Sequence, residues 1–134
     1  MDQKAINLLK SERVCALSVC LPDGGCHNAA MHFSLNENPL TIYIQTENTS
    51  IKCQKLPTRA SIEIGFSEET MQTLQLDGEI KKIEGDLTEI HKIHYVKNPT
   101  AEQYKNDPGT VFLTFTPTWW RYSDYKNEIF LENT

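Results

Sequence analysis

Residues 13–46 read RVCALSVCLPDGGCHNAAMHFSLNENPLTIYIQT, and this stretch predicts three consecutive antiparallel strands. The first is the apolar run Arg13–Leu21, which Pro22-Asp23-Gly24-Gly25 ends with a strong turn signal. The second covers Cys26–Leu35, and after another turn the third alternates apolar and polar residues through Leu40–Thr46. Turns this short indicate a sheet built from hairpins.

The rest of the chain adds strands and only a few helices. Further strands are expected at residues 60–66, 74–80 and 110–116, with a last one at 128–132, and Gly78 suggests a bulge or a tight corner. Short helices are expected at residues 3–10, 50–56 and 86–96, with a second helical piece after Pro99. Because helices and strands do not alternate, the sequence predicts a mainly β fold: a small antiparallel β-barrel with a few short helices.

Composition limits the function classes. The chain has 134 residues and a formal net charge of −5, which suits one domain spanning residues 1–134. Its longest nearly apolar run, residues 14–21, is far shorter than the roughly 20 residues of a membrane helix. No basic cluster exceeds Lys81-Lys82, and the start shows no leader pattern. We therefore expect a cytoplasmic protein that binds neither membrane nor nucleic acid.

The cysteines and histidines do not predict a metal site. Four cysteines lack the close pairing of structural zinc sites, and we expect them to be reduced and mostly buried. His91 and His94 lie three residues apart on an expected helix, but they offer only two ligands. His94 falls between Leu87 and Ile90 on the helical wheel, which favours a satisfied histidine at the edge of the core.

The order and spacing of several short segments resemble those of the FMN-binding split barrels related to pyridoxamine 5′-phosphate oxidase. The similarity covers nearly the whole chain, although each segment alone is degenerate. The matching segments are Leu8–Lys10, Pro22–Gly24, Ala29–Phe33, Ile42–Thr46, Thr49–Lys52, Leu76–Ile80, the helices between Asp86 and Tyr104, and Phe115–Tyr122. The resemblance implies a split antiparallel β-barrel of the FMN-binding type that forms a homodimer, with two FMN sites at the interface, each built from both chains.

The phosphate site implied by this resemblance follows the third strand. Ser50 and Lys52, with Thr49 beside them, match the family's phosphate-binding segment, although Ile51 stands where many relatives carry arginine. A flavin phosphate needs backbone N–H groups, hydroxyls and a cation in a small space, and this segment offers all three. The alternative is that Ser50 only caps a helix and that Lys52 is a solvated charge.

The resemblance assigns further residues to the flavin ring. Residues Asn28, Ala29, Ala30, Met31 and His32 match the strand that lies against the isoalloxazine, and Gln75 falls near a family position that reaches the cofactor. Alternatively, Ala29, Met31 and Phe33 share a strand face and pack in the core, while His32 on the opposite face is a surface histidine.

The adjacent tryptophans Trp119 and Trp120 must point in opposite directions on a strand, so at most one packs inside the barrel. We take Trp120 as the candidate cofactor contact. Packing at an interface between subunits would explain an outward tryptophan equally well.

The resemblance predicts an FMN-binding protein that acts as a flavin-dependent oxidoreductase on a small-molecule substrate or electron donor. The flavin would carry the chemistry, so no catalytic side chain is assigned. Trp120-Arg121-Tyr122-Ser123 lacks the family's Arg-x-His pattern for substrate phosphate, which argues against the vitamin-forming oxidase itself. The alternatives are a non-catalytic flavin-binding or stress-response protein, or a haem-binding split barrel with His32, His91 or His94 as iron ligand.

Overall fold

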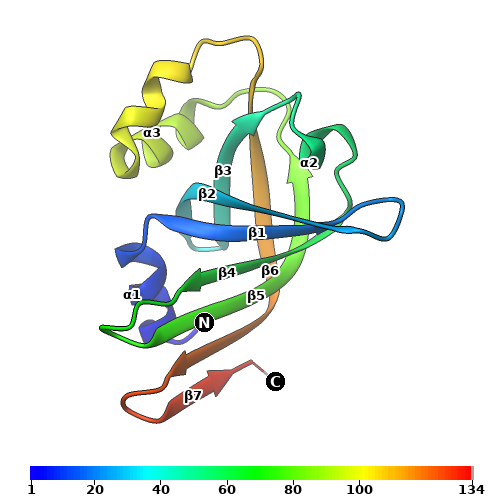
Figure 1. Cartoon of the computed structure of the whole chain (residues 1–134). Helices are drawn as coiled ribbons and strands as arrows, with labels where there is room; N and C mark the ends of the chain where they lie inside the picture. The colour runs from blue at the N-terminus through cyan, green and yellow to red at the C-terminus, as the bar shows by residue number, and fades with distance from the viewer. Residues whose placement is uncertain (134) are drawn as a thin grey trace.

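The computed structural model describes residues 1–133, and its main feature is a closed barrel of six antiparallel strands (Figure 1). The strand order is β3-β2-β1-β4-β5-β6-β7, and β3 also pairs with β6, which closes the barrel and leaves β7 outside it. The strands are β1 (Val14–Cys20), β2 (Cys26–Glu37), β3 (Leu40–Glu47), β4 (Arg59–Gly65), β5 (Gln72–Lys82), β6 (Thr110–Asp124) and β7 (Ile129–Glu132). The predicted mainly β barrel is confirmed.

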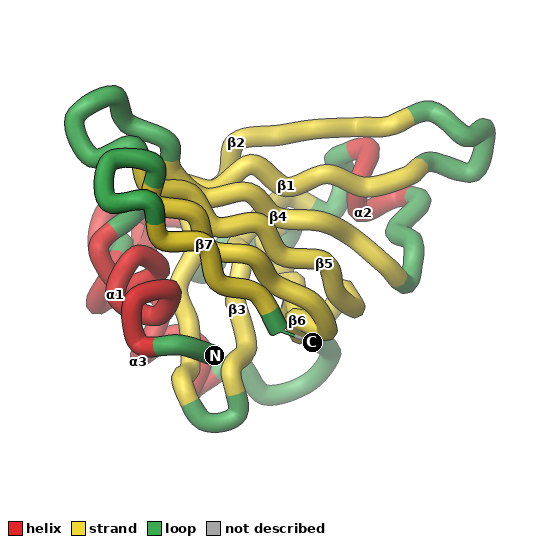
Figure 2. Tube along the Cα trace, turned by 90° about the horizontal axis from the view of Figure 1, so that it is seen from below, coloured by secondary structure: helices red, strands yellow, loops and turns green. Residues whose placement is uncertain are grey.

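The helices lie at the places where the sequence predicts them. They are α1 (Gln3–Ser11), α2 (Ile51–Gln54), α3 (Thr88–Lys97) and the 3-10 helix η1 (Pro99–Tyr104). Asp2 caps α1, because its Oδ1 accepts a hydrogen bond of 2.8 Å from the Lys4 N–H. In Figure 2, α1 and α3 lie on one side of the barrel and α2 lies on the other.

The barrel interior is apolar. Alternate residues of each strand point inward, and Leu17, Ile62 and Phe115 are each no more than 2% exposed. Ala60, Ile62 and Ile64 of β4 are buried as the alternation predicts. Phe66 is not: β4 ends at Gly65, and Phe66 turns outward with 48% of its surface exposed.

The bulge predicted at Gly78 is present and explains why β6 is longer than expected. The β5–β6 register shifts between Asp77 and Gly78, where Gly78 faces Pro117. A β-carbon at Gly78 would collide with the carbonyl oxygen of Thr116, so only glycine fits. A proline is tolerated at such an irregularity, and β6 therefore continues through Pro117 instead of ending at Thr116.

Within residues 1–133, none of the helices has the length and apolar character needed to cross a lipid bilayer.

Candidate functional site

The barrel opens between β2 and β3. Residues 33–37 of β2 pair with β3, whereas residues 26–32 pair only with β1. The end of β3 pairs with β6 instead. Figure 1 shows β2 and β3 diverging from their shared hairpin.

The free edge of β2 carries main-chain hydrogen-bonding groups. The Leu21 N–H donates to the Gly25 carbonyl at 2.7 Å, so these two residues form a hydrogen-bonded pair. From this pair onward, hydrogen-bonded and non-hydrogen-bonded pairs alternate along β1 and β2. Because adjacent residues point their N–H and C=O groups to opposite sides, those of Asn28, Ala30 and His32 point away from β1 and into the opening. A flat polar ligand would find donors and acceptors there.

A cavity of about 420 Å³ occupies this opening. One wall comes from β2, one from the end of β3, and η1 with part of α3 covers the side. The lining residues used below are Ala30, Met31 and His32 of β2, Gln45, Thr46 and Glu47 of β3, and His94, Ala101 and Tyr104 from the helical side.

Gln45 is the polar residue that joins β3 to η1. Its Nε2 donates to the Ala101 carbonyl at 3.3 Å, whereas its Oε1 is buried without a hydrogen-bond partner among the described residues. Unpaired buried acceptors are uncommon in folded proteins, because each loses its hydration without compensation. Gln45 therefore brings an unused acceptor to the edge of the cavity.

His94 lies beneath the same cavity and is fully buried. Its Nδ1 shares a hydrogen bond of 2.7 Å with the Ser34 hydroxyl, whereas its Nε2 has no partner in the described part of the chain. Burial, followed by the nearby charges of His32, Lys97 and His91, lowers the pKa of His94 to about 4. The ring is therefore neutral at physiological pH.

Ser50 and Lys52 follow β3 directly. The Ser50 N–H donates to the Glu47 carbonyl at 3.1 Å, which ties the segment to the last cavity-lining residue of β3, three positions earlier. The Ser50 Oγ is buried without a hydrogen-bond partner among residues 1–133, and it makes no helix-capping bond. Lys52 is only 6% exposed, and no carboxylate within residues 1–133 forms an ion pair with it. A lysine with a mostly buried side chain and a buried hydroxyl without a partner among the described residues thus lie two residues apart.

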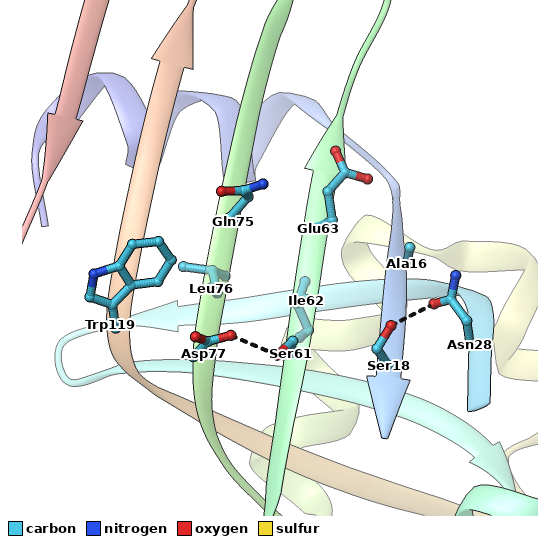
Figure 3. Close-up of a pocket in the computed structure, with 10 residues that line it drawn as sticks. All are labelled: Ala16, Ser18, Asn28, Ser61, Ile62, Glu63, Gln75, Leu76, Asp77 and Trp119. Carbon is cyan, nitrogen blue, oxygen red and sulfur yellow. Dashed lines mark hydrogen bonds between the residues drawn. The ribbon is translucent and has the colours of Figure 1, made fainter. Parts of the chain in front are cut away.

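A second hollow, of about 450 Å³, lies on the outer face of the sheet across β1, β2, β4, β5 and β6 (Figure 3). Polar cross-strand pairs line it: Ser18 Oγ donates to Asn28 Oδ1 at 3.0 Å, and Ser61 Oγ donates to Asp77 Oδ1 at 2.6 Å. We call this surface the outer groove. Trp119 closes one end of it, as Figure 3 shows.

The predicted site residues are distributed between these two hollows. Ala30, Met31 and His32 line the cavity in the opening, whereas Asn28 and Gln75 line the outer groove. Thr49 is exposed, while Ala29 and Met31 are partly buried, with Met31 packed against the core. Trp120 also packs against the core, and Trp119 is the tryptophan that faces outward.

The sequence pattern did not indicate Gln45, and it predicted His94 as a satisfied histidine at the edge of the core. The sequence could have indicated Gln45, since it lies at the end of an alternating strand, shortly before the candidate phosphate segment. The unpaired Nε2 of His94 has no counterpart in the sequence pattern, because it depends on how α3 packs on β2.

Cys20 and Cys26, the strand residues next to the β1–β2 turn, are more exposed than the sequence analysis predicts. Cys15 is buried and Cys53 is half-buried, but Cys20 and Cys26 are exposed. The expectation of mostly buried thiols is therefore wrong for this pair.

Comparison with known proteins supports the fold strongly. No protein-family model and no curated protein matches the chain. Among solved structures, a Clostridium acetobutylicum protein related to general stress protein 26 of Bacillus subtilis, of the pyridoxinephosphate oxidase family, superposes with a TM-score of 0.75 at 16% identity, covering 98% of this chain and 96% of that one. The chain has the split-barrel fold of the pyridoxamine 5′-phosphate oxidase-like proteins.

Two further split barrels indicate how varied this fold is. General stress protein 26 from Bacillus anthracis gives a TM-score of 0.76 at 19% identity, covering 98% of this chain and 97% of that chain. A haem-binding protein from Mycobacterium smegmatis gives 0.80 at 17% identity, covering 97% of this chain. This chain spans only 57% of the haem-binding protein's length.

Proposed function

We propose that this split barrel binds FMN as a homodimer and acts as a flavin-dependent oxidoreductase. The observation that carries the proposal is the buried, unpaired Ser50 Oγ close to a buried Lys52 that has no ion pair within residues 1–133. The Lys52 Nζ is not among the fully buried unpaired atoms, so it reaches the surface, and a phosphate there would accept a charge-assisted hydrogen bond from it.

The phosphate group of FMN suits this segment. It would accept a hydrogen bond from the Ser50 hydroxyl and a charge-assisted bond from Lys52. Ile51, where many relatives carry arginine, is 53% exposed and offers the phosphate no charge. Lys52 is then the main cation of the site, which makes its contribution to affinity large.

The opening between β2 and β3 suits the flavin ring. Ala30 has a small side chain, and the edge of β2 presents main-chain donors and acceptors to a flat heterocycle. The bound FMN would supply hydride or single-electron transfer. The side chains here would orient the ring and limit the access of water to it.

A second copy of the chain would complete the site across the outer groove. Gln75 and Trp119 line the outer groove, whereas Ala30 and His32 line the cavity in the opening, so the two sets of predicted contacts lie in different hollows of one chain. Light scattering of the FMN-loaded protein should report twice the 15.4 kDa of one chain. A mass of one chain at micromolar concentration would contradict the dimer.

The phosphate assignment is tested by titrating FMN and riboflavin into the flavin-free wild type and into Lys52→Ala. Loss of a charge-assisted contact costs about 1.5–3 kcal/mol, so FMN affinity should fall roughly 10- to 150-fold. Riboflavin lacks the phosphate, and its affinity should hardly change.

Lys55→Ala is the matched control, because Lys55 follows the same short helix but is exposed. It should leave both affinities within about twofold of the wild type. Unchanged FMN binding in Lys52→Ala would overturn the phosphate site.

Redox activity is tested by adding NADH or NADPH to the FMN-loaded protein without oxygen. Bleaching of the flavin absorbance supports an oxidoreductase. If neither donor reduces the flavin, the non-catalytic alternative is favoured, a storage or stress-response role like the one the name of the Bacillus anthracis neighbour suggests.

Haem is the second candidate ligand. His32 and His94 line the same cavity, and the Mycobacterium smegmatis neighbour is a haem-binding protein. The absorption spectrum after reconstitution separates the two ligands. A flavin spectrum with retained FMN supports the proposal, whereas a strong haem band that His94→Ala abolishes would replace it.

A further inference from the structure

Two exposed cysteines face each other across the β1–β2 hairpin. Cys20 is the last residue of β1, Cys26 is the first of β2, and the two are directly opposite in the strand register. Both are exposed free thiols. The pair plays no part in the proposed flavin site.

The hairpin holds this pair at a separation suited to a disulfide. The Leu21 N–H donates to the Gly25 carbonyl at 2.7 Å, and the Gly24 N–H donates to the Leu21 carbonyl at 2.9 Å. Since bonded and non-bonded pairs alternate, Cys20 and Cys26 form a non-hydrogen-bonded pair. Such pairs have α-carbons about 4.5 Å apart, at the lower end of the range of disulfides, roughly 4.4–6.8 Å.

Hydrogen bonds and a left-handed glycine define the turn that brings the two strand ends opposite each other. Gly24 has φ +87°, a conformation that glycine adopts without strain, and the Gly25 N–H donates to Asp23 Oδ1 at 2.8 Å. Closing a disulfide therefore requires side-chain rotation and only a small change of the backbone.

The other two cysteines are poorly placed for the same chemistry. Cys15 lies on the inner face of β1, and burial raises the pKa of its thiol to about 12. Cys53 is half-buried on α2, across the barrel from α1 and α3. The structure thus separates one exposed pair from two sheltered single thiols.

We propose that Cys20 and Cys26 form a reversible dithiol–disulfide site that reacts with small-molecule disulfides such as oxidised glutathione. One thiol loses its proton and attacks the glutathione disulfide, which forms a mixed disulfide and releases one glutathione thiolate. The second thiol then loses its proton and attacks the protein sulfur of that mixed disulfide, releasing the second glutathione thiolate. The protein is oxidised by two electrons, and one glutathione disulfide is reduced to two thiols.

The new bond would adjoin the outer groove. Cys20 and Cys26 share a strand face with Ser18 and Asn28, and the Ser18–Asn28 hydrogen bond is the next outward-facing pair along the hairpin. Oxidation would therefore fix the strand ends beside the groove wall. The site itself does not depend on FMN binding.

The test treats the reduced wild-type protein with oxidised glutathione under native conditions. Intact mass should fall by two hydrogen atoms and return after treatment with dithiothreitol. Cleavage on the N-terminal side of Asp23 separates the two cysteines, so the expected product without reductant is a pair of fragments still joined. Glutathione retained on Cys20 or Cys26 without joined fragments, or no reaction at all, would overturn the proposal.

Two single variants, and one double variant that serves as the control, sharpen the result. Cys20→Ser and Cys26→Ser should each gain one glutathione on the remaining exposed cysteine, because the resolving thiol is gone. The double variant Cys15→Ser/Cys53→Ser should still give the joined fragments, and their loss there would contradict the assignment.

The same reaction in urea tests whether folding selects the pair. Cys15 and Cys20 are five positions apart and Cys20 and Cys26 are six, so the unfolded chain should form both disulfides. The native chain should form only the Cys20–Cys26 disulfide. Equal mixtures in both states would show that the hairpin exerts no selection, and would overturn the proposal.

Discussion

The barrel interior and the packing layer under α3 are both buried, but they treat polar atoms differently. The interior cluster consists of apolar side chains and Tyr122, and several of its residues have no exposed surface. The layer under α3 buries Ser34, His94 and Asn98. Three of its atoms have no partner within the described residues: His94 Nε2, Asn98 Oδ1 and the Tyr95 hydroxyl oxygen.

The two regions therefore contribute differently: the barrel interior stabilises the fold, whereas the unpaired polar atoms under α3 lower its stability. Apolar burial in the barrel stabilises the fold by about 25 cal/mol for each Å² removed from water. Unpaired polar atoms under α3 work against stability by about 1–3 kcal/mol each. His94 also lines the cavity in the opening between β2 and β3, so this part of the polar layer is placed to contact a ligand, which the apolar barrel interior is not.

The largest expected effect lies in the barrel. Phe115→Ala removes a ring with no exposed surface and should lower the free energy of unfolding by about 3–5 kcal/mol, measured by urea denaturation. Phe130→Ala is the control, because Phe130 is 49% exposed and its loss should cost no more than about 0.5 kcal/mol. Similar losses in both variants would show that the interior does not dominate stability.

The next effect is a pH dependence of the polar layer. The folded-state pKa of His94 is about 4, below its ordinary value of 6.5, so the unfolded chain binds the proton first as the pH falls. Stability is therefore complete above pH 6.5 and decreases down to pH 4. The loss should be on the order of 3 kcal/mol, measured by urea denaturation at several pH values.

His94→Gln should lack this component, because glutamine does not titrate. Hydrogen bonds to Asn127 and Thr88 lower the pKa values of Asp124 and Asp86 respectively below 3.8, so these carboxylates lose their stabilising effect only at lower pH. An unchanged slope between pH 4 and 6.5 in His94→Gln would assign the dependence to another group.

The smallest expected effect is at Ser50. Ser50→Ala removes a buried hydroxyl that makes no hydrogen bond within residues 1–133, so the flavin-free protein should be unchanged or more stable by up to about 1 kcal/mol. FMN affinity should fall in the same variant. A clear loss of stability by thermal denaturation would show that the Ser50 hydroxyl stabilises the fold. Ser50 would then resemble the barrel residues, not the polar groups assigned to binding.

The barrel could be predicted because its signals are local. Alternation of apolar residues, the turn at Pro22–Gly25 and the glycine at position 78 each follow from the chemistry of a few neighbouring residues. The same local rule fails where a strand ends or continues unexpectedly. Phe66 keeps the alternation of β4 but lies beyond its end, and β6 passes through Pro117 because the bulge at Gly78 admits it.

The candidate site was less predictable because it depends on the arrangement of distant segments. The resemblance brought Ala30, Met31 and His32 to attention, and these do line one cavity. The contributions of Gln45 and His94 to that cavity require η1 and α3 to fold back over the sheet. Periodicity showed that the two tryptophans face opposite ways, but not that Trp119 is the outward one.

The β3–β6 pairing also determines when the molecule can be completed. It joins residues 42–47 to residues 110–115, across more than sixty intervening positions. During synthesis, the β2–β3 hairpin can form early from local contacts, but the free edge of β3 must wait for β6, in the last quarter of the chain. Until then the nascent protein exposes the edge of β3 that β6 later covers, and a factor that shields strand edges would have the most to protect at this stage.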